Sequence, residues 1–141
     1  MVNIVIISGY FDPLHSGHLE YIKQAKEYGN ELWVIVNNDL QVILKKEKSF
    51  MNEIERIKIL MSLKNVDRVI LSRDEDRSVN RTLLILRGLF PLQEFIFANG
   101  GDVNRRNCRE EKQCKLLGIK TIYGLGKKIQ SSSWLTRIKE K

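Results

Sequence analysis

Short apolar runs rich in β-branched residues recur along this chain, separated by segments long enough for helices. The runs occupy Asn3–Ser8, Glu31–Val36, Val69–Leu71, Glu94–Ala98 and Ile119–Tyr123. The first contains Ile4-Val5-Ile6-Ile7 without a polar interruption, which is typical of a strand buried on both faces of a parallel sheet. The alternation therefore predicts an α/β fold with a mainly parallel five-stranded sheet and right-handed crossovers.

Helical periodicity fills most of the intervening segments. Apolar residues fall on one side of predicted helices at Leu19–Tyr28, Glu53–Leu63, Val79–Leu89 and Arg109–Leu117. A terminal helix is predicted at Trp134–Lys139, whereas the lysine-rich stretch Asn37–Ser49 carries no helical prediction. The 141 residues contain no repeat, low-complexity tract or linker. We therefore expect a single Rossmann-like domain over residues 1–141, its sheet flanked by helices.

Composition excludes several classes of protein. With 43% hydrophobic and 29% charged residues, the chain is globular rather than disordered or fibrous. No apolar run approaches the roughly 18 residues that a membrane span needs, and the N-terminus lacks the basic leader and cleavage site of a signal peptide. Cys108 and Cys114 are too few for a disulfide scaffold and lack zinc-site spacing. A cytoplasmic location without membrane attachment is expected.

The charge balance points to anionic ligands. Lys and Arg number 24 against 17 Asp and Glu, giving a net charge of +7. Nucleic acid, anionic lipid and phosphorylated small molecules would all suit such a surface. The basic residues are dispersed, and no aromatic stacking platform stands on a basic strand face. A nucleic-acid-binding domain therefore stays the weaker alternative, and no nucleic-acid partner is expected.

The segments that leave the predicted strands hold most of the unusual residue choices. In an open parallel sheet, ligands bind beyond the carboxyl ends of the strands. These segments are Gly9–His18, Asn37–Ser49, Asn99–Asn107 and Gly124–Ser133. The first contains both histidines of the chain, which bracket the start of a predicted helix.

The pair His15 and His18 is the strongest site signal. Three residues apart, both imidazoles can approach one point near the helix N-terminus, where Gly17 leaves room for a ligand. Imidazole N–H groups and the free N–H groups of the helix start would suit a polyphosphate. The alternatives are histidines that cap the helix or lie in the core, and a zinc site, which lacks a third nearby ligand.

The loop after the first strand reads Gly9-x-Phe11-Asp12-x-x-His15-x-Gly17-His18 and includes an HxGH element. It resembles the signature of the cytidylyltransferase-like nucleotidyltransferases. The resemblance continues in chain order. It includes Val36-Asn37-Asn38-Asp39, the basic residues Lys45, Lys46 and Lys48, Glu53-x-x-Arg56, Asn99-Gly100-Gly101-Asp102 and Ile129-Gln130-Ser131-Ser132-Ser133.

This resemblance implies nucleotidyl transfer, in which an acceptor phosphate attacks the α-phosphorus of a nucleoside triphosphate and pyrophosphate leaves. Positioning and charge stabilisation then suffice for catalysis. The implied catalytic residues are His15, His18, Lys46 and Arg56. The implied nucleotide-binding residues are Gly9, Tyr10, Phe11, Asp12, Gly17, Gly100, Gly101, Asp102, Lys128, Ser131, Ser132 and Ser133. Asp39, Lys45 and Lys48 are candidates for the acceptor or its phosphate.

The implied cofactor is Mg²⁺, held mainly by phosphate oxygens and water, with Asp12 as the nearest candidate carboxylate.

Gly124–Lys128 departs from the Arg-Thr-Glu-Gly of the glycerol-3-phosphate branch, and Val103 replaces its tryptophan. The triphosphate is therefore CTP or ATP. The acceptor stays open among glycerol phosphate, a sugar 1-phosphate, a phosphorylated alcohol and FMN. The resemblance also implies a homodimer. A regulatory module without catalysis is the remaining alternative, which the intact histidines disfavour.

Overall fold

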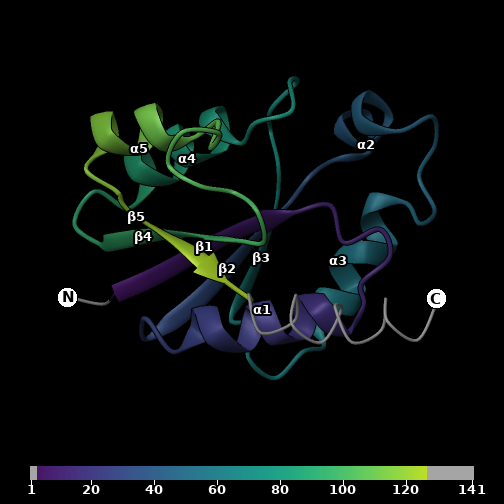
Figure 1. Cartoon of the computed structure of the whole chain (residues 1–141), viewed down its shortest axis with the longest axis horizontal. Helices are drawn as coiled ribbons and strands as arrows, with labels where there is room; N and C mark the ends of the chain where they lie inside the picture. The colour runs from purple at the N-terminus through teal and green to yellow at the C-terminus, as the bar shows by residue number, and fades with distance from the viewer. Residues whose placement is uncertain (1–2, 127–141) are drawn as a thin grey trace.

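The computed structural model describes residues 3–126. One five-stranded parallel sheet lies at its centre, in the order β3-β2-β1-β4-β5 (Figure 1). The strands are β1 (Asn3–Gly9), β2 (Glu31–Val36), β3 (Arg68–Leu71), β4 (Glu94–Gly100) and β5 (Lys120–Leu125). The helices are α1 (Ser16–Lys26), α2 (Asp39–Lys45), α3 (Glu53–Met61), α4 (Asn80–Leu89) and α5 (Glu111–Leu117). The predicted α/β class and parallel five-stranded sheet are confirmed.

The central strand β1 explains the uninterrupted apolar run. Ile4 and Ile6 pack into one core with Leu83 of α4 and Cys114 of α5. Val5 and Ile7 point the other way, into a second core that includes residues of α1 and α3. Each of these four β1 side chains is at most 2% exposed. Because successive side chains of a strand alternate between faces, a strand covered on both faces must be apolar throughout.

The chain order reverses at β1, which pairs with β2 on one side and β4 on the other. Helices α1 and α3 cover one face of the sheet, and α4 and α5 cover the opposite face (Figure 1). At such a switch point the exits of the two central strands diverge toward opposite layers and leave a crevice between them. The fold therefore places the loop after β1 at the mouth of a ligand crevice.

The predicted helices and strands are confirmed to within about three residues at their ends, apart from α2. Asn38 caps this helix by accepting the N–H of Gln41, and the Gln41 side chain accepts the N–H of Asn38 in return. Leu40 and Ile43 are more than half exposed, so α2 lacks the buried apolar stripe that marks a helix in sequence. The predicted helix Trp134–Lys139 lies outside the described residues. In residues 3–126, no helix has the length and apolar character to cross a bilayer.

Candidate active site

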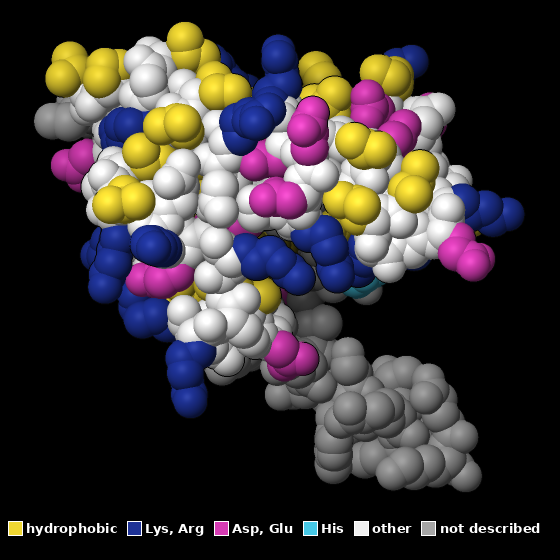
Figure 2. All heavy atoms as spheres, turned by 90° about the horizontal axis from the view of Figure 1, so that it is seen from above, with side chains coloured by type: hydrophobic (Ala, Val, Ile, Leu, Met, Phe, Trp, Pro, Cys, Tyr) yellow, Lys and Arg dark blue, Asp and Glu magenta, His cyan; other side chains and the backbone are white. Residues whose placement is uncertain are grey.

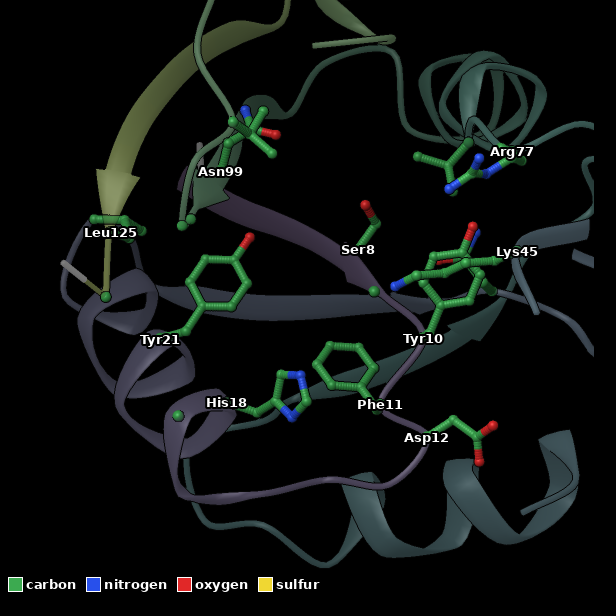
Figure 3. Close-up of a pocket in the computed structure, with 18 of the residues that line it drawn as sticks. Ser8, Tyr10, Phe11, Asp12, His18, Tyr21, Lys45, Arg77, Asn99 and Leu125 are labelled. Carbon is green, nitrogen blue, oxygen red and sulfur yellow. The ribbon is translucent and has the colours of Figure 1, made fainter. Parts of the chain in front are cut away.

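A cavity of about 660 Å³ opens at the carboxyl edge of the sheet, between the start of α1 and the starts of α4 and α5 (Figure 3). All five strand exits contribute to its lining. The contributing residues are 8–13 after β1, His15, Gly17, His18 and Tyr21 at α1, Asn37 and 45–46 around α2, Arg77 and Val79 after β3, 99–101, 103 and 108–110 after β4, and 125–126 after β5.

The two histidines cap α1 and orient each other. Nδ1 of His15 accepts the N–H of Gly17 at 3.1 Å, and Nδ1 of His18 accepts the N–H of His15 at 3.1 Å. Their rings stack with centroids 3.8 Å apart. A neutral imidazole whose Nδ1 accepts carries its proton on Nε2. The capping alternative is therefore correct, and it leaves each histidine with an Nε2–H donor at the cavity.

The charge of His18 is set by its surroundings. Burial, followed by the nearby charges of His15 and Lys45, lowers the pKa of His18 to about 4. The imidazole is therefore neutral at pH 7. It serves the cavity as a hydrogen-bond donor rather than as a cation.

A sharp backbone turn holds the loop after β1. Phe11 has a φ of 52°, in the left-handed region, and its buried ring lies edge-on to His18 with centroids 5.0 Å apart. A Cβ atom on Gly9 would stand 2.8 Å from Cζ of that ring. Glycine at position 9 thus lets the ring fill the space beneath His18. Gly9, Phe11 and His18 form one packed unit.

The carboxylate of Asp12 is occupied by protein donors. It accepts the N–H groups of Phe50 and Met51 at 2.8 and 2.6 Å and pairs with Lys46 at 3.0 Å. Although burial alone would raise its pKa, the bonds from Phe50, Lys46 and Met51 hold the pKa of Asp12 below its usual value. Its side chain is only 1% exposed and points away from His18 (Figure 3). In the structure Asp12 anchors Lys46, and its predicted role as a possible metal ligand stays a prediction.

Arg56 lies beneath the site instead of in it. The residue is 1% exposed, and its Nη1 donates to the carbonyl oxygens of Tyr10 and Asn37 at 2.8 and 2.6 Å. Nε donates to Met51, and Nη2 pairs with Asp39 at 2.7 Å. These partners leave the guanidinium no access to a substrate phosphate. The predicted contact of Arg56 with substrate phosphate is therefore corrected: Arg56 fixes the loops that follow β1 and β2. Asp39, whose side chain is 38% exposed, stays a predicted acceptor residue.

The remaining predicted residues divide into three groups. Gly9, Tyr10, Phe11, Gly17, Lys45, Lys46, Gly100 and Gly101 line the cavity together with the histidines. Lys48 and Asp102 do not line it. Lys128, Ser131, Ser132 and Ser133 lie outside the described residues.

Positive charge gathers on the side of the cavity away from α1. Lys45 places its Nζ 4.4 Å from the centroid of the Tyr10 ring. Partial burial, then the neighbouring Arg77 and Lys46, lower the pKa of Lys45. Within residues 3–126, neither Lys45 nor Arg77 forms a salt bridge. Cations that repel each other without acidic partners suit an anionic ligand.

Sequence reasoning missed Arg77, Tyr21 and Glu110. Arg77 follows β3, whose exit is absent from the four segments predicted to form the site although it meets the same sheet edge as the others. Tyr21 lies one turn beyond His18 on α1, and its hydroxyl donates to Ala98 O at 2.6 Å. Recognising that all five strand exits converge would have identified Arg77.

Two further observations bear on the ligand class. In the described part of the chain, no group of three or more His, Cys, Asp or Glu side chains is arranged to hold a metal ion. On the face seen from above, Lys and Arg side chains are interspersed with acidic ones (Figure 2). The cations that line the cavity therefore suit a small anionic ligand, and this face shows no track for a polyanion.

Comparisons with known proteins agree with this geometry. A FAD synthase of Picrophilus torridus is 28% identical over 137 residues, covering 94% of this chain and 93% of that protein. A FAD synthase of Archaeoglobus profundus is 31% identical over 117 residues, covering 83% of this chain and 70% of that protein. A FAD synthase of Methanohalophilus mahii is 42% identical over 72 residues, so the chain spans about half the length of that relative.

A solved structure and a family model extend the similarity. The lipopolysaccharide core biosynthesis protein of Thermoplasma volcanium superposes with a TM-score of 0.70 at 28% identity, covering 88% of this chain and 95% of that one. A nicotinic acid mononucleotide adenylyltransferase of Plasmodium falciparum, at 19% identity and a TM-score of 0.62, shares the fold over 87% of this chain and 64% of its own. The cytidylyltransferase-like family model matches residues 6–130. The chain therefore belongs to the cytidylyltransferase-like family.

Proposed function

We propose that the chain is a nucleotidyltransferase that moves a nucleoside monophosphate from a nucleoside triphosphate to a phosphorylated small molecule and releases pyrophosphate. The observation that carries this proposal is one cavity with two Nε2–H donors at the start of α1 and the cations Lys45 and Arg77 on the other side. Membership of the cytidylyltransferase-like family supports it.

The histidine end of the cavity is the proposed place for the triphosphate. The two imidazoles donate from Nε2 to phosphate oxygens, because the backbone N–H groups of His15, Gly17 and His18 are already bonded to the histidines. Lys46 adds a positive charge held by Asp12. His18 stays neutral at pH 7, so it donates without giving up a proton. Donors that are already oriented stabilise the charge that builds on the α-phosphate in the transition state.

The acceptor phosphate is assigned to Lys45 and Arg77. One of its anionic oxygens attacks the α-phosphorus and forms the new P–O bond. The bond between the α-phosphorus and the bridging oxygen breaks in line, and pyrophosphate leaves with the electron pair. The attacking oxygen carries no proton, so the reaction needs no general base. The protein contributes alignment of the two phosphates and compensation of their charge.

ATP and FMN are the first substrate pair that we propose, because several relatives carry the name FAD synthase. CTP and the other phosphorylated acceptors are the alternatives. Mg²⁺ would screen the phosphate charges through phosphate oxygens and water. We propose no protein ligand for it, since the Asp12 carboxylate is bound to Lys46, Phe50 and Met51. A homodimer and a cytoplasmic location stay predictions, the first checked by sedimentation against the 16.5 kDa chain mass.

Pyrophosphate release from each triphosphate against a panel of phosphorylated acceptors tests the proposal. We expect release only when triphosphate, acceptor and Mg²⁺ are all present. A stable nucleotidyl–enzyme adduct formed without acceptor would overturn direct attack. Binding of ATP without pyrophosphate release, for every acceptor, would favour the regulatory module.

A further inference from the structure

A buried acidic side chain lies on the wall of the cavity opposite the histidines. Glu110 directly precedes α5 and is 9% exposed, yet it lines the cavity. Beside it are Cys108 and Asn99, whose side chains also reach the cavity lining. We call Asn99, Cys108 and Glu110 the polar wall. The transfer reaction proposed above uses none of these three side chains.

The Glu110 carboxylate has spare capacity to accept hydrogen bonds. Oε2 accepts the N–H of Val79 at 2.9 Å, and Oε1 lies 3.7 Å from Sγ of Cys108. A carboxylate offers about four acceptor positions, and a thiol is a weak donor. The backbone N–H of Glu110 is a third donor to its own carboxylate, so at least one acceptor position remains. A further donor can therefore be accommodated from the cavity side.

The electrostatics of the wall agree with that count. Burial raises the pKa of Glu110, because these three donors do not replace the water that an ionised carboxylate loses. Burial also raises the pKa of Cys108, so the thiol keeps its proton and acts as a weak donor. Asn99 Oδ1, 3.8 Å from the same sulfur, is a second acceptor on the wall. Acceptors outnumber strong donors here.

The three side chains of the polar wall thus differ chemically from the cationic side of the cavity, although Arg109 also lines the cavity beside them and its charge lowers the pKa of Glu110. Lys45 and Arg77 attract anions, whereas a second anion placed against Glu110 would meet a buried carboxylate across a poorly solvated gap. Juxtaposition of like charges in such a place costs several kcal/mol. A hydroxyl or N–H group at the same point would gain a charge-assisted hydrogen bond instead.

We propose that Glu110 recognises a neutral hydrogen-bond donor on the non-phosphate part of the acceptor and rejects acceptors that carry a carboxylate there. The inference rests on the proposed function, because it presumes that the acceptor phosphate lies at Lys45 and Arg77. A hydroxyl of a polyol phosphate and an imide N–H of a flavin share the required chemistry. Glu110 therefore selects the class of acceptor without taking part in the transfer.

Two matched pairs of phosphate esters separate a donor from a carboxylate at nearly constant size. Glycerol 3-phosphate is compared with 3-phosphoglycerate, and nicotinamide mononucleotide with nicotinate mononucleotide. Titration calorimetry gives the Kd of each in the presence of a non-hydrolysable ATP analogue, so the readout does not depend on turnover. FMN, titrated in the same way, distinguishes an imide from a hydroxyl as the favoured donor.

The test variant is Glu110→Gln, which keeps a side-chain oxygen for the N–H of Val79 and replaces the charge with a carboxamide. The matched control is Glu75→Gln, which makes the same charge change at an exposed position outside the cavity lining. In the wild type, we expect the donor-bearing member of each pair to bind at least about tenfold more tightly. Glu110→Gln should reduce that preference about tenfold, and Glu75→Gln should leave it unchanged.

Equal affinity within both pairs for the wild type overturns the proposal, whatever the variants do. The same preference in Glu110→Gln and Glu75→Gln also overturns it. A failure of the proposed function gives a different result: no acceptor supports pyrophosphate release. Acceptor-dependent release combined with no effect of Glu110→Gln refutes the role of Glu110 alone.

Discussion

Nδ1 of His18 accepts the backbone N–H of His15 at 3.1 Å, so the second histidine of the pair fixes the position of the first. Capping uses one nitrogen of each ring and leaves the other for the cavity. One pair of side chains thereby stabilises the start of α1 and presents two donors to a ligand. The capping role seen here and the predicted phosphate-binding role of the histidines are compatible, because they concern different atoms.

His18→Asn is expected to lower kcat by about 10²–10³ while thermal stability stays close to that of the wild type. The asparagine oxygen can replace Nδ1 as the acceptor for the His15 N–H, but no donor remains at the position of Nε2. Pyrophosphate release and thermal unfolding measure the two effects. His18→Ala is the control that also loses the cap, at a cost of about 1 kcal/mol. Near-wild-type kcat in His18→Asn would contradict the donor role.

Folding stability is expected to fall as the pH is lowered from about 6.5 to about 4. The pKa of His18 is about 4 in the folded chain against an ordinary 6.5, so the unfolded chain takes up the proton first and acid favours unfolding in this window. Urea unfolding at a series of pH values measures the slope. His18→Asn should show a flatter dependence, and an unchanged slope would contradict the low pKa.

A bound triphosphate is expected to raise the pKa of His18. Phosphate charge next to the ring favours the imidazolium and opposes the burial and the nearby charges of His15 and Lys45 that now lower it. Titration of the histidine ring protons by NMR, with and without ATP, measures the change. The unphosphorylated nucleoside is the control and should leave the pKa near its starting value. Equal effects of both ligands would place the triphosphate elsewhere.

Arg56→Met is expected to destabilise the fold by about 3 kcal/mol, because it removes the donors of two buried carbonyl oxygens and the partner of Asp39. Denaturant unfolding measures the loss. Arg106→Met, at an exposed position, is the control and should stay within about 0.5 kcal/mol of the wild type. A fully stable Arg56→Met variant with low activity would restore a direct catalytic role for Arg56.

Arg77→Ala is expected to raise the KM for the acceptor about tenfold and to change kcat less, since a charged hydrogen bond to a phosphate contributes about 1.5–3 kcal/mol. Steady-state kinetics with varied acceptor measure both constants. Lys48→Ala removes one positive charge outside the cavity lining and should change neither. A larger effect of Arg77→Ala on the KM for the triphosphate would place the triphosphate, and not the acceptor phosphate, at Lys45 and Arg77.

Features that depend on residues close together in the chain, such as the strands and the loop after β1, could be predicted from the sequence. The apolar runs become the five strands, and the cavity forms where the exit of β1 carries His15 and His18. Helix α2 was missed because its apolar side chains Leu40 and Ile43 are exposed, so the periodic signal of a buried face is absent.

Residues whose role depends on distant partners could not be assigned from sequence. Arg56 reads as a phosphate ligand by its place after a basic loop, and only the fold reveals that Tyr10 and Asn37 surround it. Glu110 reads as a surface acid, yet the N–H of Val79, 31 residues earlier, binds it inside the cavity. Burial of a charged side chain depends on tertiary packing, which local patterns do not encode.

The position of β1 also determines which part of the site an engineer can exchange. This strand is hydrogen-bonded on both edges and packed on both faces. The segment that carries the histidines therefore follows the most constrained strand of the sheet. The polar wall instead belongs to β4 and to the loop that leads into α5. A chimera in which the loop of a relative replaces residues 101–110 should keep the transfer chemistry. It should also acquire that relative's preference among phosphorylated acceptors.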